Sequence, residues 1–318
     1  MKANYGLGLA ALFAVAVLQA GPPARAVGEP RALTPEGSYY MAPRWSPLGG
    51  LLAVSGPQYA GIYLVSVPGG KVTQLADDPA AGVGLAWSPT GELILTSVSK
   101  YRHRRRTNAL AVFDVITGER TALTDFASGP AGTARWDGQG RTIQVVDRDG
   151  RERQFDATRQ LAEIKPRPLP RQEPMLAAGN ELVRFDPAAG EPVAISTVEG
   201  RKLNLAVSPD GERMAFEIVG GHLWVTDIDG GNPKDLGLGN EPAWNPGADG
   251  LAFIVTEDDG HRILSSDIYV AKGDGSGRSI LRATEGVLEM HPAWSPDGRF
   301  IAYGDLVTGR IYLQEVAR

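Results

Sequence analysis

The densest cluster of charge in the sequence is a short basic run that begins at Lys100. Its members are Lys100, Tyr101, Arg102, His103, Arg104, Arg105 and Arg106. Guanidinium groups bind carboxylates, phosphates and sugar acids through planar pairs of N–H donors. The run therefore predicts an anion-binding loop, and a solvated hairpin loop is the alternative interpretation.

Histidines are the other side chains that could transfer protons or bind a metal near neutral pH. The four are His103, His222, His261 and His291. His222 starts an apolar alternating segment, which favours a structural or surface role, and His103 and His261 fall in expected loops. His291 precedes Trp294 by three residues in a repeated unit, which makes it the candidate for ligand or metal contact. The alternative is that His291 is a polar side chain lining a channel that contains only water.

The motifs of common catalytic sites are missing from the sequence. There is no G-x-S-x-G, no G-x-G-x-x-G between a strand and a helix, no P-loop and no H-E-x-x-H, and the chain has no cysteine. Asp227, Asp229 and Asp274 lack the order and the distant glutamate of a calcium loop, so they are expected to be turn residues. These observations predict a protein without catalysis, without a bound metal and without a cofactor.

The elements that would position such residues are set by an internal repeat. Its clearest copy is Ala293-Trp294-Ser295-Pro296-Asp297-Gly298, and the anchor residues of all copies are Trp45, Trp87, Trp136, Val207, Trp244 and Trp294. In each copy a short strand ends at the anchor, and Pro, Asp and Gly then form a tight turn. Three further strands follow, so the unit has four strands in about 40 residues, the period of a β-propeller blade.

The interval between Trp136 and Val207 is nearly twice the shortest one, which suggests a hidden copy. Residues 173–195 are interpreted as strands two to four of a unit whose first turn has decayed. The sequence therefore predicts an all-β chain, a β-propeller of about seven four-stranded blades, with six as the alternative. The last copy ends after its third strand, and Pro30–Thr34 is expected to supply the fourth and close the ring.

These units closely resemble the TolB-like propeller repeat, whose pattern is W-S-P-D-G, an apolar strand, and a strand ending in a D-x-D-G turn. The segments Ile228–Gly231 and Gly273–Gly277 match the second turn. The resemblance covers roughly residues 30–318 and implies the fold more than a function. TolB has an additional N-terminal α/β domain, which we do not expect here because the repeats begin soon after the leader.

Propeller geometry places the residues three positions before the anchors near the mouth of a central channel. This inner column contains Ala42, Gly84, Thr133, Asn204, Glu241 and His291. Neighbouring blades would set Glu241 beside His291. The basic loop and the acidic loop Glu257–Gly260 join second to third strands, so both are expected on the face where the inner strands begin.

An apolar leader precedes the repeats. Lys2, the apolar residues 6–20 and the sequence Ala24-Arg25-Ala26 predict a signal peptide over residues 1–26 and a mature domain over 27–318. The net charge of −5 becomes −7 without Lys2 and Arg25, which argues against a nucleic-acid binder. No later run is long enough for a transmembrane segment. A monomer in the periplasm or outside the cell is expected.

Three functions remain open at this point. The first is a non-catalytic interaction module that binds a protein, a peptide or an anionic glycan on one face. Its expected site residues are Arg102, His103, Arg104, Arg105, Arg106, Glu241 and His291. The second is a metal-dependent lyase, since oligogalacturonate lyases have similar repeats and a histidine-lined metal site. The third is a small-ligand binder at the channel mouth.

Overall fold

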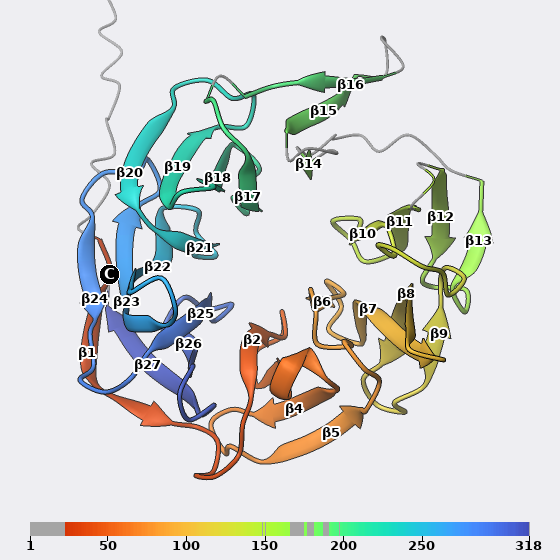
Figure 1. The fold of residues 1–318 in the computed structure, drawn as a ribbon, viewed down its shortest axis with the longest axis horizontal. Coiled ribbons are helices and arrows are strands. Elements are labelled where there is room, and N and C mark those ends of the chain that lie inside the picture. The colour runs from red at the N-terminus through yellow and green to blue at the C-terminus, as the bar shows by residue number, and fades with distance from the viewer. Residues whose placement is uncertain are drawn as a thin grey trace, which may run out of the picture.

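The computed structural model describes residues 23–147, 149, 151–165, 175–176, 181–186, 191–196 and 198–317. Their strands form seven antiparallel sheets arranged as a ring (Figure 1). The one helical element among these residues is a single 3-10 turn, Pro57–Tyr59. The prediction of an all-β propeller with about seven blades is confirmed, and the alternative of six blades is wrong.

The first three blades follow the repeat directly. Blade 1 contains β2 (Met41–Trp45), β3 (Leu51–Ser55), β4 (Ile62–Ser66) and β5 (Val72–Ala76). Blade 2 contains β6 (Ala86–Trp87), β7 (Leu93–Arg102), β8 (Arg105–Asp114) and β9 (Arg120–Ala122). Blade 3 contains β10 (Thr133–Trp136), β11 (Thr142–Val146), β12 (Glu152–Asp156) and β13 (Ala162–Ile164).

The last three blades have the same order. Blade 5 contains β17 (Lys202–Val207), β18 (Arg213–Ile218), β19 (His222–Asp227) and β20 (Lys234–Leu238). Blade 6 contains β21 (Asn240–Trp244), β22 (Gly250–Asp258), β23 (Ile263–Lys272) and β24 (Ser279–Arg282). Blade 7 contains β25 (Glu289–Trp294), β26 (Phe300–Asp305), β27 (Ile311–Ala317) and β1 (Arg25–Ala32).

The hidden copy is blade 4, of which the structure describes β14 (Met175–Leu176), β15 (Leu182–Asp186) and β16 (Glu191–Ala194). The sequence interpretation took this segment as strands two to four. In the structure β14 lies against β17, the innermost strand of blade 5, so β14–β16 are the first three strands. The correction follows from ring packing, because the first strand of each blade must lie innermost.

The repeated turn is held by bonds inside its own few residues. In the copy at Ser208, Gly211 N donates to Ser208 O at 2.8 Å, and Arg213 N donates to the Ser208 hydroxyl at 2.9 Å. Gly211 has a φ of +69°, the left-handed conformation that glycine adopts without a Cβ penalty. The equivalent serines, Ser46, Ser88 and Ser295, are also buried. A turn determined so locally can be recognised in the sequence.

The anchor tryptophans join neighbouring blades. Trp87 Nε1 donates to Arg44 O at 3.0 Å, and Trp45, Trp136 and Trp244 form the same bond to Ala293, Ala86 and Ala206 of the preceding blade. In each case the acceptor is the residue before the neighbour's anchor. Trp294 departs from the pattern, since its Nε1 is buried without a partner among the described residues.

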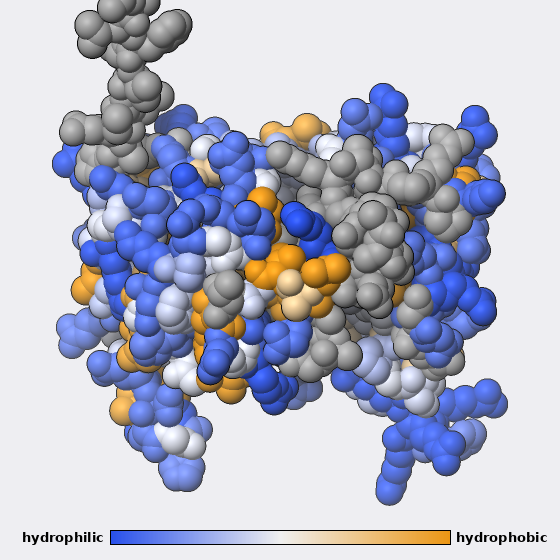
Figure 2. Space-filling view, turned by 90° about the horizontal axis from the view of Figure 1, so that it is seen from above, coloured by the Kyte–Doolittle hydropathy of each residue, from blue (hydrophilic) through white to orange (hydrophobic). Residues whose placement is uncertain are grey.

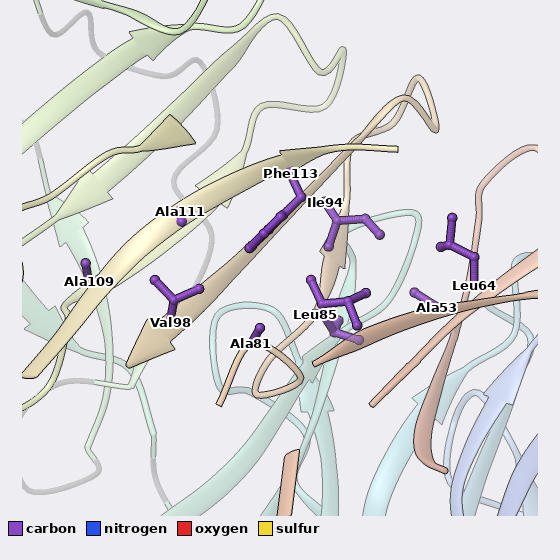
Figure 3. Close-up of a cluster of buried hydrophobic side chains, with 10 residues drawn as sticks. Ala53, Leu64, Ala81, Leu85, Ile94, Val98, Ala109, Ala111 and Phe113 are labelled. Carbon is purple, nitrogen blue, oxygen red and sulfur yellow. The ribbon is translucent and has the colours of Figure 1, made fainter. Parts of the chain in front are cut away.

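Apolar side chains fill the space between adjacent blades. Between blades 1 and 2, Ala53 and Leu64 face Ile94, Val98 and Phe113 (Figure 3). Nearly all of these side chains are inaccessible to solvent. Burial of each large apolar side chain is worth about 1.5–3 kcal/mol, so the blades are held together mainly by these layers.

The N-terminal strand closes the ring, as predicted. β1 pairs antiparallel with β27, and Leu33 N donates to Ile311 O at 2.7 Å. The pairing reaches further upstream than Pro30, because a bulge near Gly28 carries it on to Arg25. Predicted leader residues 25 and 26 therefore belong to β1, and residues 1–22 lie outside the described residues.

The antiparallel registers define two faces of the disc. Met41, at the start of β2, pairs with Ser55 at the end of β3. The inner strands therefore begin on the face where second strands turn into third strands, and we call this the mouth face. The Ser-Pro-Asp-Gly turns lie on the opposite face. Among the described residues, no helix has the length and hydropathy of a membrane span.

Candidate binding site at the channel mouth

The inner column is built on a backbone irregularity that recurs from blade to blade. In β2, β17, β21 and β25 one extra residue interrupts the register with the second strand. The residues concerned have positive φ, namely Ala42 (51°), Asn204 (46°), Glu241 (54°) and His291 (56°), and Gly84 shares the conformation (67°). Thr133 departs from the column, because β10 and β11 pair without a bulge.

Left-handed backbone at non-glycine residues costs of order 1 kcal/mol each and is concentrated at binding sites. Bulges also redirect side chains at the ends of sheets. The four bulged residues differ in type, so the conformation comes from the fold. Its effect is to bring their side chains and N–H groups to the channel mouth.

A chain of hydrogen bonds connects the bulges of blades 5, 6 and 7. Asn204 Nδ2 donates to Glu217 Oε1 at 2.7 Å, and Glu241 N donates to the same oxygen at 2.5 Å. Glu241 Oε2 in turn accepts His291 N at 2.8 Å and lies 2.8 Å from His291 Nδ1. The predicted pairing of Glu241 with His291 is therefore present, and it is part of a larger network.

The mouth opens into a cavity of about 530 Å³ between the inner strands. Its polar lining combines Asn204, Glu241 and His291 with Arg44 and Tyr59 from blade 1. Tyr59 lies in the β3–β4 connection, and Arg44 directly precedes the anchor Trp45. The cavity thus presents a guanidinium, a phenol, an imidazole and a carboxylate together.

Enclosure and mutual charge change the acidity of these groups. The surrounding protein lowers the pKa of Arg44, although solvent reaches the side chain through the channel, and Glu241 acts in the opposite direction. Burial, followed by the charge of Glu241, raises the pKa of Tyr59. Burial also raises the pKa of Glu217, against the effect of the bond from Asn204. The charged groups of the cavity therefore influence one another's protonation.

The basic run forms the end of a long hairpin. β7 pairs with β8 from Leu93 through Arg102, well beyond its pairing with β6, and the run expected to be a loop contains a turn of two residues. His103 (φ 49°) and Arg104 (φ 62°) occupy that turn. Such turns favour Asn-Gly, since both positions need left-handed backbone.

The hairpin tip contributes little to folding. Arg102 lies directly opposite Arg105 in the ladder, and like charges so placed repel each other. Tyr101 is 62% exposed. Of the four arginines of the tip, all within the described residues, Arg106 alone donates side-chain hydrogen bonds, from its Nε to Ser99 and Asn108. The tip therefore combines left-handed backbone with like-charge repulsion at the protein surface.

A second hairpin projects from the mouth face on the other side of the ring. β22 ends at Asp258 and β23 begins at Ile263, and Asp259 Oδ1 accepts bonds from His261 N and Arg262 N. These bonds lower the pKa of Asp259. Figure 2 shows two hydrophilic projections on one face, at the sides where Figure 1 has β7–β8 and β22–β23.

The predicted site residues thus divide into two groups on one face. Glu241 and His291 line the cavity, whereas Arg102, His103, Arg104, Arg105 and Arg106 lie on the hairpin and are not part of its lining. Sequence reasoning missed Arg44, Tyr59 and Glu217. A signal for Arg44 existed, because the position before the anchor is alanine in four of the six copies.

The remaining candidates take structural positions. His222 begins β19 at the surface and lies 2.9 Å from Asp235 through Nδ1, in agreement with the structural or surface role expected for it. Asp229 and Asp274 accept backbone bonds from Gly231 and Ser276 within their turns. Across the described residues, no three histidine or acidic side chains are grouped as ligands for a metal ion.

The fold and the cavity together define a seven-bladed propeller with a polar channel mouth. A scan against protein-family models found none that matches the sequence, and a search of curated proteins also found no match. Similarity to solved structures is extensive. TolB from Acinetobacter baumannii has 18% identity and a TM-score of 0.53, with 81% of this chain and 57% of that chain covered.

A TolB-type protein from Agrobacterium tumefaciens has 18% identity and a TM-score of 0.54, with 93% of this chain and 97% of that chain covered. The propeller domain of Cps50 (Swd1) from Myceliophteria thermophila has 14% identity and a TM-score of 0.60, over 91% and 100% of the two chains. The chain spans little more than half of the first of these relatives. It has a TolB-like β-propeller fold, which confirms the resemblance seen in its repeats.

Proposed function

We propose that this chain is an exported, monomeric interaction module that binds a protein or peptide on its mouth face. The observation that carries the proposal is the β7–β8 hairpin, whose strained turn and opposed arginines lower stability while presenting cations to solvent. A rigid ring with such a projection is suited to binding. Export is supported by the apolar leader and the sequence Ala24-Arg25-Ala26.

The charge of the hairpin indicates the kind of partner. The chain as a whole is acidic, so it repels anionic groups except near this tip. Screening acts over about 8–10 Å at physiological ionic strength, so the attraction is local. A carboxylate-bearing protein segment fits the hairpin, and an anionic glycan is the alternative partner.

The test is affinity capture of the mature protein's partners from the envelope fraction of its own source, followed by mass spectrometry. The informative variant replaces Arg102, Arg104, Arg105 and Arg106 with Ser. We expect partner affinity to fall at least about tenfold, which is 1.4 kcal/mol, and its salt dependence to flatten. The fold should be retained, since of these four side chains Arg106 alone donates hydrogen bonds within the described residues and the tip contributes little stability.

A matched control removes four cations from the opposite face, through Lys71→Ser, Arg141→Ser, Arg159→Ser and Arg299→Ser. These side chains are exposed or border turns on that face. If both variants bind the partner as the unchanged protein does, the hairpin is a solvated loop and the proposal fails. If both weaken it equally, only overall charge matters and the hairpin is again not the site.

The proposal also holds that the module is non-catalytic and without a metal. His291, the suspected ligand, is engaged by Glu241, and three protein ligands are the usual minimum for a catalytic zinc. Elemental analysis of the purified protein is expected to find no stoichiometric transition metal. About one tightly held manganese or zinc per chain would contradict this and would favour the lyase reading.

A further inference from the structure

We propose that the channel-mouth cavity is a carboxylate-binding site in which Arg44 and Tyr59 hold the ligand. The proposal rests on the proposed function, because it assumes that the partner binds the mouth face. To the contact at the β7–β8 hairpin it adds a second contact, a carboxylate bound in the cavity. It concerns two residues that the sequence reasoning did not select. Arg44 also differs in its side-chain bonds from Arg135, the other arginine that directly precedes an anchor among the described residues.

Arg44 has hydrogen-bonding capacity that the protein leaves unused. Its Nη1 donates to Pro43 O at 3.1 Å, and the described residues supply no further bond and no carboxylate at ion-pair distance. The guanidinium nevertheless lines the channel-mouth cavity of about 530 Å³. A guanidinium has five N–H donors arranged in a fork that matches a carboxylate.

Arg135 shows what a satisfied arginine looks like at the same position of the repeat. It also directly precedes an anchor, Trp136, but its Nε and Nη2 donate to Gln144 Oε1 at 3.1 and 3.0 Å. Blade 1 has Ala53 where blade 3 has Gln144, since these residues pair with Arg44 and Arg135 in the two registers. Arg44 is therefore left free by the neighbouring strand.

Tyr59 is held over the same cavity by a rigid and strained connection. Gln58 and Tyr59 both have left-handed backbone, with φ of 55° and 59°. Tyr59 N donates to Gly56 O at 3.1 Å, and Gly82 N donates to Tyr59 O at 2.9 Å. Backbone strain that the surroundings enforce so closely is typical of pre-organised binding groups. The phenol can donate to a ligand oxygen beside Arg44.

The charges in the cavity select a monoanion. Glu241 is close enough to favour the charged form of Arg44 and to raise the pKa of Tyr59. Its Oε2 accepts His291 N and lies beside His291 Nδ1, so the carboxyl group of Glu241 has a fixed position in the site. One free cation beside one fixed anion accommodates a single carboxylate, whereas a phosphate dianion would be repelled more strongly.

The carboxylate could belong to a peptide C-terminus, to an acidic side chain or to a small organic acid. The test uses one probe of each kind with the intact mature protein. The probes are N-acetyl-tetra-alanine with a free or amidated C-terminus, an amidated alanine peptide with a central Glu or Gln, glutarate, and inorganic phosphate. Binding is followed by calorimetry and by NMR, and circular dichroism verifies the fold.

We expect at least one carboxylate probe to bind and its amide or Gln counterpart to fail. Arg44→Gln should weaken that binding at least about tenfold, or 1.4 kcal/mol. Arg44→Lys keeps the charge but loses the forked pair of N–H donors. Its affinity for the probe should lie between that of the unchanged protein and that of Arg44→Gln. Tyr59→Phe should weaken binding about threefold to tenfold. Arg135→Gln is the matched control and should leave it unchanged.

The pattern of probes identifies the source of the carboxylate, and each positive pattern supports the proposal. Absence of binding by every carboxylate probe up to about 10 mM would overturn it, because even a millimolar site would then be detected. Preference for phosphate, or an unchanged affinity in Arg44→Gln, would also overturn it. If no probe binds but the four-arginine hairpin variant still loses partner affinity, only this site is refuted. If a probe binds but the hairpin variant keeps its partner affinity, only the proposed function is refuted.

Discussion

A buried carboxyl group in blade 7 makes the stability of this propeller depend on pH. Glu289 starts β25 and is inaccessible to solvent, and its Oε2 has no partner among the described residues. Oε1 accepts a bond from Thr284 N at 3.0 Å. Burial raises the pKa of Glu289 from 4.5 to about 7, and the nearby Asp267 adds to the rise.

The sign of the effect follows from proton linkage. Because the folded state holds the Glu289 proton more tightly than the unfolded chain, the folded protein loses stability as pH rises. The stabilising contribution is complete below pH 4.5, falls between pH 4.5 and about 7, and is gone above that range. At about 1.4 kcal/mol for each pKa unit, the total is about 3 kcal/mol.

The perturbation that isolates this contribution is Glu289→Gln, which keeps the shape of the side chain and removes its ionisation. Urea denaturation of both proteins between pH 4.5 and 8 gives the difference in unfolding free energy. We expect that difference to shift in favour of the variant by about 3 kcal/mol over this range. The exposed Glu285 on the preceding loop provides the control, as Glu285→Gln removes one negative charge at the surface.

A constant difference between Glu289→Gln and the unchanged protein from pH 4.5 to 8 would refute the reasoning. It would mean that Glu289 is hydrated or paired when the protein is folded. A shift of similar size in Glu285→Gln would refute it in another way, because general surface charge would then explain the pH dependence.

Two further predictions concern how the ring is held together. Deletion of residues 25–34 removes β1 and the buried Leu33, so it should lower the free energy of unfolding by several kcal/mol. It should also cause aggregation through the exposed edge of β27. An unchanged melting temperature and a monodisperse sample would contradict ring closure. Trp87→Phe loses the bond to Arg44 O, whereas Trp294→Phe loses an N–H that has no partner among the described residues. In denaturant unfolding, Trp87→Phe should therefore lower the free energy of unfolding by about 1 kcal/mol more than Trp294→Phe does. The reverse order would contradict a stabilising role for these bonds.

The sequence could predict which residues share the channel mouth but not which hydrogen bonds they form there. Sequence position could place Glu241 and His291 in one column, because the repeat fixes their distance from the anchors. It could not show that Glu217, 24 residues before Glu241, accepts its N–H. Nor could it show that Arg44 is free while Arg135 is bonded, since that difference depends on the residue across the strand pair.

The extent of the hairpin was similarly hidden. The basic run was expected to be a loop, but β7 and β8 continue pairing to Arg102 and Arg105. A turn of His103 and Arg104 lacks the Asn-Gly, Asp-Gly or Gly-Gly pair that two-residue hairpin turns favour. The pairing of β7 with β8 imposes the left-handed conformation on this turn, so the residue preferences of the turn could not predict it.

The sequence by itself determined the blade plan of this protein. Each Ser-Pro-Asp-Gly turn is fixed by hydrogen bonds within a few residues and by the φ preferences of Pro and Gly, and these are local properties that sequence displays. Only the tertiary structure decided what the channel mouth contains. Closure of seven blades brings inner strands from distant parts of the chain together, and the bulges then turn Ala42, Asn204, Glu241 and His291 alike toward the mouth. Residues of such different type share that conformation because the packed ring imposes it.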